Sequence, residues 1–136
     1  MKKIFVILLM GCFLLNLPLL TAKANPVITK EWEGKYSYSY GEGRACGTLN
    51  IFSQEGKLMC SINTSIGAPS YNMAIVENKP CLIANNHIYC QPDKSDRKFE
   101  IIFQDNYAEV KYVSGKWGGY FGQNATIEGR YWKEEA

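Results

Sequence analysis

Residues 98–113 read KFEIIFQDNYAEVKYV, and this stretch indicates the class of the fold. Asp105-Asn106 lies between two runs of alternating apolar and polar residues, and both residue types tolerate a tight two-residue turn. The register that this turn implies sets apolar residues opposite apolar ones and an acid opposite a base: Phe99 with Tyr112, Ile101 with Val110, and Glu100 with Lys111. A slip by one residue would turn one apolar face outward. We therefore predict a β-hairpin with one buried face.

Short runs of the same kind continue along the rest of the chain, separated by turn residues and without a helical period. Further strands are expected at 35–40, 48–53, 57–64, 71–77, 81–84, 87–90 and 125–132. With the first hairpin, this pattern predicts an all-β fold of about eight or nine antiparallel strands. A small up-and-down barrel of about eight strands is expected, because closure leaves no strand edge exposed.

The first 24 residues differ in composition from the rest. Lys2-Lys3, an apolar run from Ile4 to Leu20, and Ala22-Lys23-Ala24 form the three parts of a bacterial secretory signal peptide. The sequence thus predicts a signal peptide at 1–24 and one periplasmic or secreted domain at 25–136.

Two kinds of membrane attachment compete with the signal-peptide interpretation. A membrane-spanning helix prefers about 20 clean apolar residues, whereas Asn16 and Pro18 interrupt this run. A lipid on Cys12 rests on a loose match at residues 9–12, but the apolar run continues beyond Cys12 to Leu20. We expect no permanent membrane anchor.

Charge argues against one class of partner. The whole chain has a formal charge of +2, but without Lys2, Lys3 and Lys23 twelve basic residues face thirteen acidic ones. Binding to nucleic acid needs a clearly basic face, and the predicted mature domain has a net charge of about −1. Nucleic acid is therefore not an expected partner.

Four cysteines remain after the signal peptide, and in an oxidising compartment an even number predicts two disulfides. Residues 80–90 are expected to form a second hairpin around Asn85-Asn86. Its register sets Cys81 opposite Cys90 at a non-hydrogen-bonded pair, where the two Cα atoms are close enough for a disulfide. We therefore predict the Cys81–Cys90 bond.

The second disulfide, Cys46–Cys60, follows by elimination from the three possible pairings. It fits the strands less well, because a turn at 54–56 sets Cys46 opposite residue 63 or 64. Cys46 must then lie on a bend, or the pairing differs. No metal site is predicted, because the chain has no Cys-x-x-Cys motif and a single histidine.

The sequence carries no recognisable catalytic set. His87, the only histidine, lies beside the predicted turn at 85–86, and no Gly-x-Ser-x-Gly motif is present. Disulfide-bonded cysteines supply no thiolate nucleophile, and no Gly-rich loop ends in the Lys-Ser or Lys-Thr that cradles phosphate. No local signature marks a pair among the 13 acidic residues for glycoside hydrolysis. We predict a protein that is not an enzyme and needs no cofactor.

Residues 114–123 form a glycine-rich segment that carries three aromatic side chains. Loops on a rigid scaffold often hold binding residues, and Trp and Tyr are typical of interface centres. The predicted partner-binding residues are Ser114, Lys116, Trp117, Tyr120 and Phe121. The alternative is that these aromatic residues fill one end of the barrel.

An interior ligand site is a second candidate. An eight-stranded barrel holds either packed side chains or one small ligand. The predicted lining residues are Tyr38, Met73 and Phe103. Packing of the first strand against the core is the alternative role for Tyr38.

Trp32-x-Gly34-x-Tyr36 opens the first expected strand, and residues 122–131, GQNATIEGRY, close the last one. Together with a signal peptide and four cysteines, these motifs resemble those of small, secreted, lipocalin-like bacterial barrels. The resemblance implies a lipocalin-like, up-and-down barrel.

Ser114-Gly115 and the ending YWKEEA at 131–136 carry a second similarity. They are similar to a Ser-Gly segment and an aromatic-Lys-acidic-Ala ending in the periplasmic lysozyme inhibitors. This similarity implies a binding protein that inhibits a lysozyme-like or other envelope-attacking enzyme. The alternative functions are a carrier of a small apolar ligand inside the barrel and a structural role in the envelope.

Overall fold

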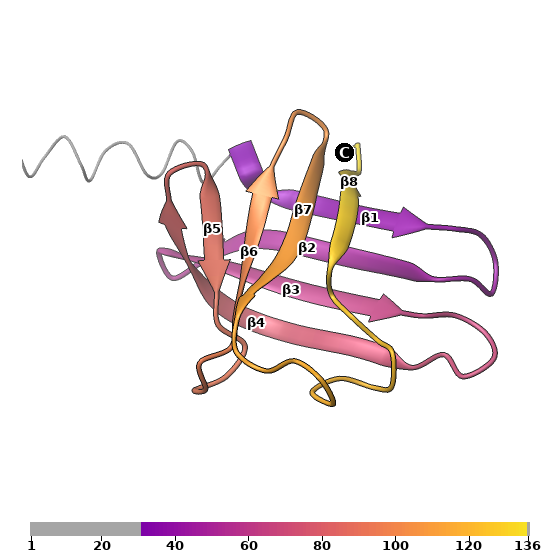
Figure 1. The fold of residues 1–136 in the computed structure, drawn as a ribbon. Helices are drawn as coiled ribbons and strands as arrows, with labels where there is room; N and C mark the ends of the chain where they lie inside the picture. The colour runs from indigo at the N-terminus through magenta and orange to yellow at the C-terminus, as the bar shows by residue number, and fades with distance from the viewer. Residues whose placement is uncertain (1–30, 136) are drawn as a thin grey trace, which may run out of the picture. The chain divides into compact units, whose positions relative to one another are not determined.

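The computed structural model describes residues 31–135, which form a closed antiparallel β-barrel (Figure 1). Each strand pairs with the next along the chain, and the last pairs with the first. The strands are β1 (Gly34–Ser39), β2 (Cys46–Gln54), β3 (Lys57–Ser65), β4 (Met73–Ala84), β5 (His87–Cys90), β6 (Lys98–Phe103), β7 (Tyr107–Ser114) and β8 (Gly129–Lys133). The prediction of a small up-and-down barrel is confirmed.

The predicted signal peptide at 1–24 and Cys12 lie outside the described residues. Within residues 31–135, no helix is long and apolar enough to cross a membrane.

Tight turns set the registers of three hairpins. Around the β6–β7 turn the observed pairs are those predicted from the sequence: Phe99 with Tyr112, Glu100 with Lys111, and Ile101 with Val110. Glu55, Gly56 and Asn85 adopt positive φ in the other two turns, with angles of 53°, 76° and 58°. Two-residue turns of this kind match the twist of the strands that they join.

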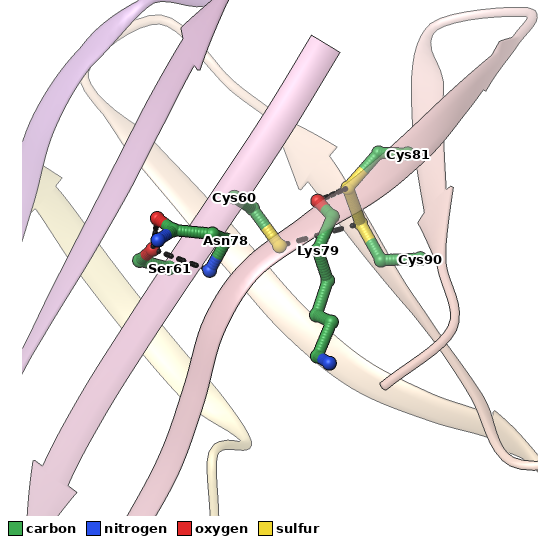
Figure 2. Close-up of a disulfide and its surroundings, with 6 residues drawn as sticks. All are labelled: Cys60, Ser61, Asn78, Lys79, Cys81 and Cys90. Carbon is green, nitrogen blue, oxygen red and sulfur yellow. Dashed lines mark hydrogen bonds between the residues drawn. A yellow bond between two sulfur atoms is a disulfide. The ribbon is translucent and has the colours of Figure 1, made fainter. Parts of the chain in front are cut away.

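Strand β4 replaces the two separate strands that were predicted at 71–77 and 81–84, so the barrel has eight strands and not nine. One extra residue lies in β4 between the pairs Ile62–Val76 and Cys60–Lys79, which is a β-bulge. Asn78 has a φ of 48° there, and its amide N and side-chain oxygen both contact the hydroxyl of Ser61, at 2.9 and 3.0 Å (Figure 2). In Figure 1, β1–β4 run across the view, whereas β5–β8 run at a steep angle to them. The bulge lets β4 pair with both groups.

Inward-facing side chains fill the barrel. Those with no exposed surface are Leu49, Cys60, Ile62, Ala74, Ile88, Phe99, Ile101, Ala108, Ile127 and Tyr131. The end of the barrel that carries the tight hairpin turns, here called the hairpin end, is covered by Trp32 and Phe103. Their rings stack with centroids 4.4 Å apart. Phe103 therefore packs as part of the core.

The cysteines behave only partly as predicted. Cys81 and Cys90 form a disulfide across the β4–β5 hairpin, with Cα atoms 4.4 Å apart, which confirms the first pairing. Cys46 and Cys60 are free thiols, so the second pairing is wrong. Cys46 pairs with Ser65 and Cys60 with Ile51, five positions along the same β2–β3 ladder. Cys46 is exposed whereas Cys60 is buried, so the two thiols also lie on opposite faces of the sheet.

Candidate functional site

The end of the barrel opposite the hairpin end carries the four longer connections, and we call it the loop end. Its segments are residues 40–45, 66–72, 91–97 and 115–128. Of the predicted partner-binding residues, Ser114 ends β7, and Lys116, Trp117, Tyr120 and Phe121 belong to the last of these segments. Hydrogen bonds join the segments to one another: Ala68 N donates to Gly43 O at 2.8 Å, and Asn72 Nδ2 donates to Gln123 O at 3.0 Å. The loop end is therefore cross-linked rather than made of independent loops.

Arg97 connects the 91–97 loop to the 115–128 loop. Its Nε donates to the carbonyl of Lys116 at 2.6 Å, and its guanidinium lies 4.3 Å from the centre of the Tyr120 ring. Its Nη1 contacts the carboxylate of Asp93 at 3.1 Å. A hydrogen bond from the Ser95 hydroxyl, aided by the Arg97 charge, lowers the pKa of Asp93. The carboxylate thus stays ionised as the partner of Arg97.

Gly115 makes this contact sterically feasible. Its φ is +89°, and a Cβ atom there would lie 2.6 Å from the Cα of Arg97. Only glycine combines this backbone conformation with such a close approach. Next to it, the hydroxyl of Ser114 donates to the carbonyl of Asp96 at 2.8 Å. Ser114 therefore fastens the two loops together and does not present a free hydroxyl.

Trp117 is half-buried and stacks on Tyr112, with ring centroids 4.2 Å apart and an interplanar angle of 16°. The ring centroids of Phe99 and Phe121 lie 6.3 and 5.9 Å from that of Trp117. Its indole Nε1 donates to the carbonyl of Ser114 at 2.9 Å. These contacts match the alternative that the loop aromatics cover a barrel end. Trp117 and Phe121 both pack against the core.

Lys116 is the predicted partner-binding residue that remains most available. Its side chain is exposed between Gly115 and the exposed pair Gly118-Gly119, while its carbonyl is held by Arg97. Tyr120 is half-buried, and desolvation followed by the nearby Asp93 charge raises its pKa. The loop thus presents one cation on a backbone that its neighbours fix.

Residues 125–128 return across the mouth of the barrel to β8. The hydroxyl of Thr64, which is only 2% exposed, donates to the carbonyl of Thr126 at 2.7 Å. The hydroxyl of Tyr112 lies 2.8 Å from the Thr126 hydroxyl and accepts from the backbone N–H of Ile127 at 3.2 Å. This network ties the returning segment to two strands, so the loop is anchored at both of its ends.

A cleft of about 230 Å³ opens beside this segment. β1 and β8 pair only at Tyr36–Lys133 and Ser37–Trp132, so the strands part at Tyr38. The cleft occupies the resulting gap. Its lining includes Tyr38, Tyr40, Thr64, Thr126 and Glu128.

The three predicted ligand-lining residues are not brought together around one cavity. Tyr38 lines the cleft and packs edge-on against Tyr131 at 5.1 Å. Phe103 lies at the hairpin end against Trp32. Met73 is 45% exposed on the outer face of β4, so its interior assignment is wrong. In this half of β4, the inward positions are Ala74 and Val76.

Sequence reasoning missed two clusters. In the first, Arg97 Nε donates to the carbonyl of Lys116, which lies 19 positions later in another loop, while the same arginine contacts Asp93 of its own loop. Only the fold brings these two loops together. The second cluster is the free thiol of Cys60, which lies 3.6 Å from the sulfur of Cys90 (Figure 2). Burial raises the pKa of the Cys60 thiol to about 12.

His87 lies next to the β4–β5 turn and contacts Glu100 through Nδ1 at 3.1 Å. His87 begins β5 and Glu100 lies on β6. This pair joins neighbouring strands, as cross-strand pairs commonly do.

Comparisons with protein-family models, with curated proteins and with solved structures found no match for this chain. The sequence and the geometry of the loop end are therefore the basis for a functional proposal.

Proposed function

We propose that this chain is an exported, non-enzymatic binding protein whose 114–121 loop recognises a protein partner. In this proposal the partner is an enzyme that attacks the cell envelope, with lysozyme-like enzymes as the first candidates. The observation that carries the proposal is the fixed backbone of the loop, which Arg97 and the Trp117–Tyr112 stack hold while Lys116 stays exposed. A loop that is ordered before binding loses less conformational entropy when it binds.

The structure changes the role that we assign to each loop residue. Lys116 is the proposed contact residue, because its ammonium group suits the acidic cleft of a carboxylate-dependent hydrolase. Trp117, Phe121 and Ser114 are proposed as positioning residues that maintain the loop. Tyr120 lies between these two roles, because the guanidinium of Arg97 covers one face of its ring and leaves less of it for a partner.

Measurement of lysozyme inhibition and binding with a panel of purified lysozymes tests this proposal. Lys116→Glu should weaken binding by at least tenfold, and its loss should be larger at low salt than at high salt. Lys57→Glu is the matched control, because Lys57 is also exposed but begins β3 beside the turn at the hairpin end. Equal effects of the two substitutions, or full binding by Lys116→Glu, would reject the loop as the binding site.

A small-ligand carrier is the second candidate, and the cleft beside Tyr38 is the observation in its favour. Pockets for small molecules usually measure about 300–1,000 Å³. The cleft of about 230 Å³ falls below that range, and the barrel interior is filled by side chains. We therefore favour the protein-binding function. Native mass spectrometry of protein purified from its own host tests the alternative, because a carried ligand would appear as an added mass.

A further inference from the structure

Three buried sulfur atoms from three different strands meet inside the barrel. The Sγ atoms of Cys60, Cys81 and Cys90 all lie within 4.8 Å of one another. The exposed fractions of the three residues are 0%, 7% and 2%. Figure 2 shows the three side chains pointing toward one another from β3, β4 and β5. The packing of the barrel interior therefore keeps a free thiol against a disulfide.

One use of such a group would be exchange of the disulfide, in which Cys60 attacks Cys90 and releases Cys81. That reaction requires the attacking sulfur to lie along the axis of the bond that breaks. With a 3.6 Å contact to Cys90, a collinear arrangement and an ordinary disulfide of about 2.05 Å would put the outer sulfurs about 5.6 Å apart. The outer sulfurs are within 4.8 Å, so the three atoms form a triangle and not a line.

A triangle of sulfur atoms matches a different chemistry. A metal ion about 2.3 Å from each of three sulfurs keeps them about 4 Å apart in a trigonal plane. The Cys60–Cys90 contact of 3.6 Å is close to that spacing, and no two of the three sulfurs are more than 4.8 Å apart. Breaking the Cys81–Cys90 bond would let those two sulfurs separate toward the same distance.

We propose that Cys60, Cys81 and Cys90 form a three-sulfur site for a soft, thiophilic metal ion, Cu(I), and that the Cys81–Cys90 disulfide blocks this site. Thiolate ligands select soft ions such as Cu(I). Structural zinc takes four protein ligands, and among residues 31–135 no His, Asp or Glu belongs to this group. Cu(I) accepts three sulfur ligands without a fourth, which suits a site closed to water.

The loading reaction balances with one external reagent, a dithiol reductant. The dithiol gives two electrons and two protons to the Cys81–Cys90 bond, which becomes two thiols, while the dithiol becomes a disulfide. Cu(I) then forms three bonds to sulfur, and protons released from the thiols go to solvent. The ion remains Cu(I) throughout. The oxidised protein cannot complete the site, since two of the three ligands are bonded to each other.

Competition with a coloured Cu(I) chelator, bicinchoninate, tests the site in the purified protein. The reduced protein should withdraw one Cu(I) per chain, and the oxidised protein should withdraw none. Cys60→Ala should weaken the reduced protein's affinity at least 100-fold. Cys46→Ala is the matched control and should leave it unchanged, because Cys46 is an exposed thiol on the outer face. X-ray absorption of the loaded protein should count three sulfur ligands.

Several results would overturn the proposal: no withdrawal of Cu(I) by reduced protein, full affinity in Cys60→Ala, loss of affinity in Cys46→Ala, or a count of two sulfurs. Reduction could also unfold the barrel, so its circular dichroism and melting temperature are measured with and without one equivalent of Cu(I). Cu(I) should raise the melting temperature of the reduced protein, or restore its fold if reduction removes it. A reduced protein that gains nothing from Cu(I) has no such site.

Discussion

Replacement of Trp117 by alanine should destabilise the barrel, because the indole is part of the packing that covers the loop end. A fully buried Trp or Phe costs about 3–5 kcal/mol when it is cut to alanine. Trp117 is half-buried, but it keeps a close stack on Tyr112 and an edge contact with Phe99. We therefore expect a loss of about 2 kcal/mol in the free energy of unfolding.

That loss is large enough to measure and small enough to leave the protein folded. For a domain of this size, 1 kcal/mol shifts the melting temperature by about 4–8 °C, so Trp117→Ala should melt about 10 °C lower. Far-UV circular dichroism is the appropriate probe, because the substitution removes a fluorophore. Trp132→Ala is the control. Trp132 is 47% exposed on β8, and among the aromatic rings of residues 31–135 it contacts that of Tyr107 only. Its melting temperature should fall by about 5 °C or less.

Variants of Trp117 also show whether the indole positions the loop or contacts the partner directly. If Trp117 positions the loop, Trp117→Phe should restore most of both stability and partner binding, because a phenyl ring can still stack on Tyr112. A Trp117→Ala variant that melts within 2–3 °C of the wild type but no longer binds a partner would refute the packing argument. The indole would then have to contact the partner directly.

Two further predictions concern the backbone and the pH response. Gly115→Ala should lower the melting temperature and increase amide exchange in both the 91–97 and 115–128 loops, because its Cβ would collide with Arg97 at a φ of +89°. Gly118→Ala, which has open space around it, should change neither measurement. Burial raises the pKa of Tyr36 to about 12, and its hydroxyl donates to the carbonyl of Trp32 at 2.7 Å. Since this folded-state pKa exceeds the unfolded value, the stabilisation is complete below pH 10 and is lost up to pH 12. It amounts to at most about 3 kcal/mol. Alkaline unfolding titrations should show a smaller loss in Tyr36→Phe, and an equal loss would contradict this role.

The fold was predictable wherever local chemistry fixes the register. Asp105-Asn106 and Asn85-Asn86 each lie between alternating runs, and the hairpin geometry follows from the turn length. The same counting predicted the Cys81–Cys90 disulfide. A closed barrel then follows because eight short antiparallel strands have two edges that can pair with each other.

The candidate site was less predictable, because its contacts join loops. Residues 114–121 could be selected from their glycines and aromatics, but their packing on Tyr112 and Phe99 depends on how the loop folds back over the barrel. Arg97 gave no signal in the sequence, since it lies in a polar run with no periodic pattern. An arginine 18 residues before a Gly-Lys pair predicts no contact until both loops are placed.

Met73 shows how the assignment of a face fails. Tyr71, Met73 and Ile75 alternate along the strand predicted at 71–77, and Met73 was predicted to line the interior. The structure exposes all three side chains, by 55%, 45% and 46%. Ala74 and Val76 face the interior instead, where large residues from the other strands leave little room.

The bulge at Asn78 determines where the sulfur atoms lie. Continued without a bulge, the inward positions of β4 at 74 and 76 would lead to 78, 80 and 82, which would bury Leu82 and turn Cys81 outward. The structure has the reverse, with Leu82 77% exposed and Cys81 7% exposed. Burying a leucine contributes about 1.5–3 kcal/mol, and a disulfide that closes a loop of about ten residues contributes nearly the same, about 2.5–3 kcal/mol. The two contacts between Asn78 and Ser61 then favour the bulged arrangement. One additional residue in β4 thus brings Cys81 and Cys90 to the free thiol of Cys60, a meeting that no spacing of cysteines in the sequence indicates.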